Sequence, residues 1–134
     1  MFFPNKSKPH IVRAVAAPTT SYVSGTVFSI DEQNMVGLMV SYTKGDETSI
    51  ELKVESSIDG GSTFYQQITQ SPSGGTITIV PGIYSITAAS YPSGTSNITF
   101  VISPIKGDVL RVSVKSTGGT PTGTVGITAI TGWV

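Results

Sequence analysis

The sequence predicts an all-β protein in which antiparallel strands form a β-sandwich or a jelly-roll-like barrel. The clearest observation lies in residues 49–55, where Ile50, Leu52 and Val54 alternate with polar residues. Alternation with a period of two indicates a strand that has one buried face and one exposed face. Clusters of glycine, proline and serine also recur, about every eight to twelve residues, which is typical of sandwiches and barrels. No segment of useful length shows the helical period.

Composition restricts the chemistry that this chain can perform. The 134 residues include no cysteine and one histidine, which excludes disulfides, thiolate zinc sites and a cysteine nucleophile. Eight basic residues balance eight acidic ones without forming a basic stripe, so we expect no nucleic-acid partner. No apolar run approaches the roughly 20 residues that a membrane helix needs, so we expect no membrane partner.

The N-terminal residues 1–24 differ from the rest of the chain and predict an extended arm, which is either a frayed tail or ordered against a neighbouring subunit or the domain's own flank. Its prolines interrupt any regular ladder, because proline lacks the backbone N–H and restricts the residue before it. Within the arm, only residues 11–15 have the composition of a short edge strand. We expect a single sandwich domain over residues 25–134.

Apolar side chains near the two termini are the predicted contact points with other subunits. A lone monomer has little use for aromatic residues at its extreme end, whereas tryptophan is enriched at interfaces. The interface candidates are Phe2, Phe3, Ile11, Val12 and Trp133.

Beyond the arm, alternating or apolar segments predict about eight or nine short strands. Residues 35–42 are apolar on both faces, which predicts a central strand. Residues 43–46 form a tight turn that contains Gly45, so 35–42 and 49–55 are predicted to pair as a hairpin. The predicted strands cover residues 26–30, 35–42, 49–55, 63–69, 76–80, 83–87, 97–102, 109–115 and 124–130.

Residues 57–64, SIDGGSTF, resemble the Asp-box motif S-x-D-x-G-x-T-W, with Phe64 in place of the tryptophan. This motif is a turn in sialidase-like propellers and other β-proteins, where it is structural and remote from any catalytic centre. The carboxylate of Asp59 is expected to accept backbone N–H bonds within the turn. Asp59, Gly60 and Gly61 are therefore predicted to be structural turn residues.

No group of side chains has the composition of a catalytic centre. His10 lies in the arm without a nearby carboxylate, and a serine nucleophile needs a base. Glu51 and Glu55 share one face of a strand with Lys53, and we expect these charges to form cross-strand pairs with Arg111 and Lys115 on a solvated face. We expect no catalytic, cofactor-binding or metal-binding residues, and no enzyme.

Aromatic residues leave a second function open, that of a carbohydrate-binding or adhesin-like module. Such a module needs an exposed row of rings, for which the candidates are Tyr65, Tyr84, Tyr91, Phe100 and Trp133. The alternative is that phenylalanines lie in the core while the tyrosines lie at its rim, with hydroxyls that reach water.

Two segments resemble the small β-rich virion proteins of tailed bacteriophages. They are residues 36–64, VGLMVSYTKGDETSIELKVESSIDGGSTF, and residues 109–133, which contain LRVSVKSTGG and ITAITGW. The resemblance is one of strands and turns, and it transfers no functional residue. It implies a non-enzymatic capsid decoration or minor head protein, with a tail or baseplate component as the alternative.

The same resemblance implies partners and a location. We expect a homo-oligomer, with a trimer as the first expectation, that contacts the major capsid protein or other virion proteins at the capsid surface. The N-terminus lacks the apolar core of a signal peptide, so synthesis is expected in the host cytoplasm.

Overall fold

The computed structural model describes residues 9–30, 33–66, 68–73, 76–81, 83–102 and 105–132. Antiparallel strands dominate, and the only helix in these ranges is the short 3-10 helix Ala88–Ser90. The predicted all-β class is therefore confirmed. The strands are β1 His10–Ala16, β2 Val23–Ser24, β3 Phe28–Ser29, β4 Met35–Thr43, β5 Asp46–Ser57, β6 Tyr65–Gln66, β7 Ile68–Ser73, β8 Thr76–Pro81, β9 Ile83–Thr87, β10 Thr95–Ile102, β11 Val109–Thr120 and β12 Thr124–Gly132.

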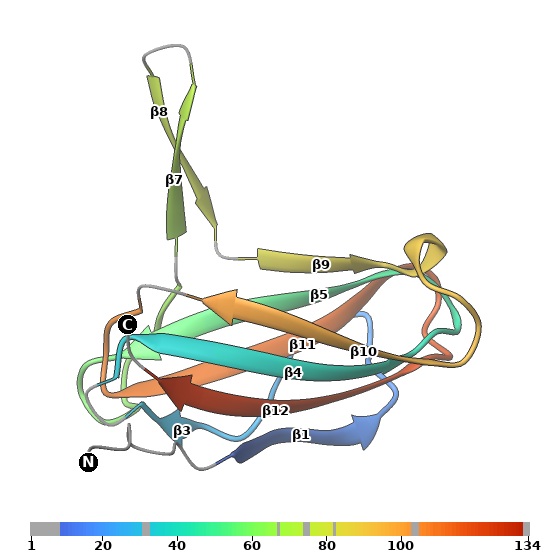
Figure 1. Ribbon diagram of the computed structural model, residues 1–134, viewed down its shortest axis with the longest axis horizontal. Coiled ribbons are helices and arrows are strands. Elements are labelled where there is room, and N and C mark those ends of the chain that lie inside the picture. The colour runs from blue at the N-terminus through green and yellow to red at the C-terminus, as the bar shows by residue number, and fades with distance from the viewer. Residues whose placement is uncertain are drawn as a thin grey trace, which may run out of the picture.

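Two sheets pack face to face and form a sandwich (Figure 1). The first sheet has the strand order β1-β12-β4-β10. In the second sheet β11 and β5 are central, with β2 and β3 beside β11, and β6 and β9 beside β5. The two sheets stay separate, so the structure decides for a sandwich and against the closed barrel that the sequence had left open.

The core lies between the two sheets and follows the period-two pattern. Successive buried positions on β4 are Val36, Leu38, Val40 and Tyr42. The residues between them point to the outer face, so β4 is a central strand of its sheet but is buried on one face only. Burial of alternate aliphatic side chains from both sheets supplies the main stabilisation, at about 25 cal/mol per Å² of apolar surface.

The predicted hairpin between residues 35–42 and 49–55 is wrong. β4 pairs with β10 and β12, whereas β5 belongs to the opposite sheet and pairs with β11. The turn at Lys44 and Gly45 therefore carries the chain across the sandwich. The connection from β11 to β12 crosses between the sheets in the same way, so most strands that are adjacent in the sequence do not pair.

The described residues form twelve strands, more than the eight or nine predicted. The difference comes from β1, which was expected as an edge strand within the arm, from β2, which has two residues, and from the division of the predicted segment 63–69 into β6 and β7. A strand of two residues is too short to show any alternation, so its sequence carries no periodic signal.

Part of the predicted arm, residues 1–24, is built into the sandwich. β1 pairs with β12 at the edge of the first sheet, and β2 pairs with β11 in the second. Val12 is only 2% exposed and belongs to the core, so it is not available to a partner, contrary to its selection as an interface residue. Alternation along β1 is the reason, since Val12 faces inward while Ile11 faces outward.

A buried carboxylate joins the two crossing connections. Glu47 accepts hydrogen bonds from the Tyr42 hydroxyl at 2.6 Å, from the Gly45 amide at 2.6 Å and from the Gly123 amide at 2.7 Å. Burial alone would raise the pKa of Glu47, but these hydrogen bonds outweigh burial and hold the pKa below its usual value. The ionised side chain thus links the turn after β4 to the turn before β12.

Candidate functional site

The outer faces of the two sheets differ in charge. In the first sheet β4, β10 and β12 contain no charged residue at all, and β1 contains only Arg13 together with His10. The Arg13 guanidinium donates hydrogen bonds to the backbone carbonyl oxygens of Val125, Ala16 and Ala17. We call the outer surface of β1, β12, β4 and β10 the neutral face.

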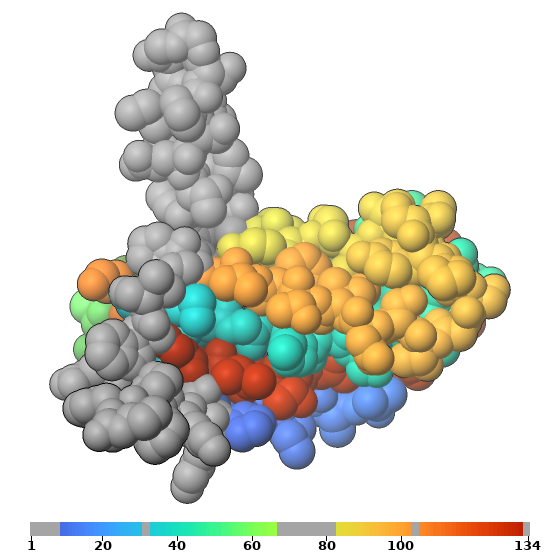
Figure 2. Space-filling model, in the orientation of Figure 1, coloured from blue at the N-terminus to red at the C-terminus, as the bar shows by residue number. Residues whose placement is uncertain are grey.

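Large apolar side chains are exposed on the neutral face. Ile11, Val15, Met39 and Val101 are between 43% and 72% exposed, and they come from β1, β4 and β10. Figure 2 shows the four strands of this sheet, β1, β12, β4 and β10, side by side as bands of blue, red, cyan and orange. Single exposed apolar residues are normal on a soluble protein, but several on one sheet face with a single charged residue are typical of an interaction surface.

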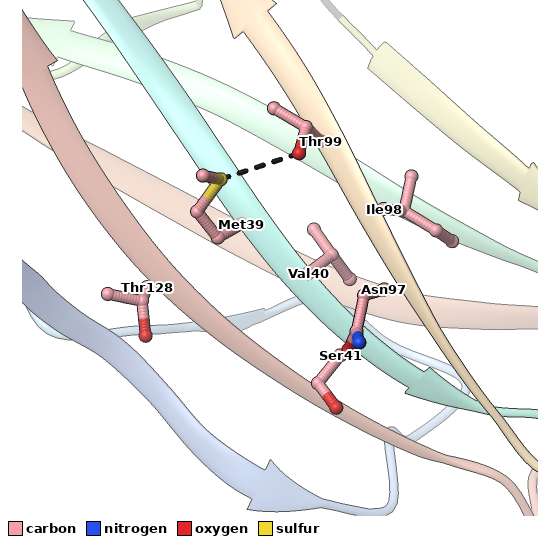
Figure 3. Close-up of a pocket in the computed structure, with 7 residues that line it drawn as sticks. All are labelled: Met39, Val40, Ser41, Asn97, Ile98, Thr99 and Thr128. Atoms are coloured by element: carbon pink, nitrogen blue, oxygen red, sulfur yellow. Dashed lines mark hydrogen bonds between the residues drawn. The ribbon is translucent and has the colours of Figure 1, made fainter.

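A groove of about 300 Å³ lies on this face, over the neighbouring strands β4, β10 and β12 (Figure 3). The Met39 side chain lies across β4, and its sulfur accepts a hydrogen bond from the Thr99 hydroxyl at 3.4 Å. The lining residues are Met39, Val40, Ser41, Asn97, Ile98, Thr99 and Thr128. None of them carries a charge, so the groove suits an uncharged surface better than a charged ligand.

The opposite sheet carries most of the charged residues of the two sheets, and four of them form pairs across strands. Arg111 lies 3.1 Å from Glu55, and Lys115 lies 3.4 Å from Glu51. These residues are direct cross-strand neighbours on β11 and β5, so the predicted cross-strand pairs are confirmed. Each such pair contributes about 0.2–1 kcal/mol. These four charges are therefore satisfied by one another and by solvent.

Tyr22 completes the charged surface. Its ring lies 4.6 Å from the Lys53 ammonium and 4.7 Å from the Lys115 ammonium, and its hydroxyl donates to Glu51 at 3.2 Å. Burial and the negative charge of Glu51 raise the pKa of Tyr22. The cations here are already engaged by an aromatic ring and by carboxylates.

The turn after β5 is closed by its own polar side chains. The Asp59 carboxylate accepts hydrogen bonds from the Ser57 hydroxyl at 2.6 Å, the Thr63 amide at 2.9 Å and the Ser62 amide at 3.1 Å. Gly60 and Gly61 have φ values of 75° and 102°, which favour glycine. The turn connects β5 to β6, and these two strands do pair as a hairpin.

We expect Asp59→Asn to lower the urea midpoint of unfolding at pH 7, with a smaller effect at pH 2. The Ser57 hydroxyl and the Thr63 and Ser62 amides lower the pKa of Asp59 from 3.8 to about 2. Its stabilising contribution is therefore complete above about pH 4 and is lost as the pH falls towards 2. Equal differences between variant and wild type at both pH values would contradict this role.

Only some of the predicted interface residues lie in the described part of the chain. Ile11 lies on the neutral face, whereas Phe2, Phe3 and Trp133 lie outside the described residues. Met39 and Val101 lie on the same face as Ile11 but were not among the interface residues predicted from the sequence. The signal that would have found them is the absence of charge from all of residues 35–43, 95–102 and 124–132.

The row of exposed rings that a sugar-binding module needs is not formed by the described residues. Tyr84, Tyr91 and Phe100 are packed against the core, and only Tyr65 of the described candidates is largely exposed. Tyr84 and Phe100 contact each other with ring centroids 5.7 Å apart. These rings contribute to packing between the sheets.

The described part of the chain holds neither a cluster of potential metal ligands nor a helix that could span a membrane. No three histidine or acidic side chains gather there as a metal site would require. No helix in those residues is long and apolar enough to cross a membrane.

No family model matches this chain, and no curated protein matches it. Among solved structures, the chain is similar to the crystal structure of the SPBc2 prophage-derived protein YomS, with 18% sequence identity and a TM-score of 0.46. The likeness covers 98% of this chain and 96% of that chain. A likeness at this level transfers no function.

Proposed function

We propose that this chain is a non-enzymatic structural protein of a tailed-phage particle. It acts at the capsid surface as a decoration or minor head protein, in the form of a homo-oligomer. The observation that carries this proposal is the neutral face, a broad sheet surface whose strands contain Arg13 as their only charged residue and expose Ile11, Val15, Met39 and Val101. The resemblance of residues 36–64 and 109–133 to β-rich virion proteins supports it.

The proposed mechanism is cementing by contact. Burial of apolar surface against neighbouring capsid subunits provides the free energy, at about 25 cal/mol per Å². Arg13 is the only charged side chain on the strands of this face, and it already bonds backbone carbonyls, so little charge is desolvated on contact and the cost of burial stays low. The charged face on the opposite side keeps the bound protein soluble and directs it to bind in one orientation.

We expect Met39→Lys to weaken binding to shells of the same virus by at least about tenfold. An ammonium group placed at the centre of the neutral face would be buried without a partner, and 1.4 kcal/mol of lost binding already equals a factor of ten. The measurement is co-sedimentation of the purified protein with shells over a range of concentrations.

Thr87→Lys is the matched control, because Thr87 is exposed on β9 in the opposite sheet. It adds the same charge at a position remote from the neutral face, and binding should stay at the wild-type level. If both variants bind as the wild type does, the neutral face is not the shell-binding surface.

A further inference from the structure

β6 and β9 are two pieces of one edge strand. Gln66 at the end of β6 pairs with Glu55 of β5, and Ile83 at the start of β9 pairs with Lys53. Only Val54 separates these two partners on β5. One residue would therefore be enough to connect β6 to β9, yet the chain inserts residues 67–82 at this point.

The inserted segment contains a hairpin that stands apart from the sandwich. β7 pairs with β8 and with no other described strand, and Figure 1 shows both strands projecting away from the two sheets. The sequence contains no charged residue between Asp59 and Lys106. A two-stranded hairpin without a further packing surface is only marginally stable in water, so this one needs a partner.

The first sheet has an open edge at β10. All eight residues of β10 pair with β4 in an unbroken register, and no described strand pairs with the other side of β10. β10 contains neither proline nor charge, the usual means of protecting an edge. The opposite edge, β1, is protected by two register shifts and by Arg13, which bonds backbone carbonyls.

We propose that the β7–β8 hairpin of one copy adds to the β10 edge of a second copy and extends the first sheet across the subunit boundary. Strand addition of this kind gains backbone hydrogen bonds along the whole edge. The hairpin and the edge are both uncharged, so no ion is desolvated when they meet.

β8 is the strand that pairs with β10. It carries proline only at its last position, Pro81, whereas β7 carries Pro72 in its interior, where a ladder donor would be missing. At about 3.4 Å per residue, β8 spans roughly 20 Å and β10 roughly 27 Å, so the edge is long enough for the whole strand.

The proposed contact is heterologous, because each copy donates a hairpin and accepts another through a different surface. Contacts of this type generate rings when the rotation closes. The inference rests on the homo-oligomer in the proposed function and names the contact that builds it, with a closed trimer as one such ring.

The test uses two variants of the full chain that lack complementary halves of the contact. The first replaces residues 67–82 by a single threonine, which restores a continuous edge strand beside β5. The second places a proline on β10, as either Ser96→Pro or Asn97→Pro. Neighbouring N–H groups point to opposite sides of a strand, so one of these two prolines faces away from β4 and keeps the fold.

Near-UV circular dichroism identifies the proline variant that stays folded, and light scattering after size exclusion gives the masses. We expect the wild type to be oligomeric and each variant alone to be monomeric. An equimolar mixture should form a complex of two chains, because one variant supplies the hairpin and the other the open edge.

A hairpin-deleted variant that still self-associates like the wild type would overturn the proposal, and so would a mixture that stays monomeric. A wild type that is monomeric alone but needs the hairpin to bind shells would assign the hairpin to a capsid partner instead. Because no shells enter the mixing experiment, its outcome is separate from that of the shell-binding test.

Discussion

Replacing Glu47 by alanine is expected to lower the free energy of unfolding by about 3 kcal/mol or more. The substitution removes the acceptor for the Tyr42 hydroxyl and for the Gly45 and Gly123 amides. Each buried donor left without a partner costs about 1–3 kcal/mol. A loss of this size is a large fraction of the roughly 5–15 kcal/mol that stabilises an ordinary domain.

The measurement is urea unfolding at pH 7, with the slope compared between variants to verify that unfolding stays two-state. Tyr42→Phe is the matched control, since it removes one donor and leaves Glu47 bonded to both amides. We expect a loss of about 1.5 kcal/mol for Tyr42→Phe. If Glu47→Ala cost no more than Tyr42→Phe, the carboxylate would not join the two turns as we describe.

Gly45→Ala is the second substitution for which we expect a large effect. A Cβ at this position would lie 2.1 Å from the Gly123 backbone nitrogen and 2.4 Å from the Thr122 hydroxyl. These atoms belong to the other crossing connection, so the two turns would have to separate. Overpacking of this kind costs about 1–3 kcal/mol, and we expect the upper end because backbone atoms cannot move aside easily.

The thermal midpoint and the urea midpoint of Gly45→Ala should both fall clearly. Gly37→Ala is the control, because a Cβ there meets only the Ile130 carbonyl oxygen at an ordinary distance of 3.8 Å. Alanine is favoured over glycine inside a strand, so Gly37→Ala should be neutral or slightly stabilising. Similar midpoints for the two variants would show that the crossing turns are not tightly packed.

Strand positions and charge pairs followed from local patterns in the sequence. The alternation in residues 49–55 and 109–115 places both segments within strands, β5 and β11. Opposite charges at the polar positions of these two segments then led to the pairs that Arg111 and Lys115 form with Glu55 and Glu51. Period-two alternation is a property of the strand itself, which is why it can be read without the partner strand.

The pairing of strands did not follow from the sequence. A tight turn at Gly45 fits a hairpin, but it also fits a connection that crosses from one sheet to the other. Both arrangements bury the same alternate residues of β4 and β5, so the local pattern is identical. The contact that distinguishes them joins Glu47 to Gly123, which lies 76 residues further along the chain.

The interaction surface, like the strand pairing, depends on local sequence and on tertiary structure. By itself, the sequence determined that the fold is all-β, where most strands and turns lie, and that long segments carry no charge. Only the tertiary structure decided that Val12 is buried, that Ile11, Met39 and Val101 share one face, and that residues 67–82 interrupt a single edge strand. Alternation along a strand states which side chains face inward, but it does not state which sheet the strand joins or which strands become its neighbours.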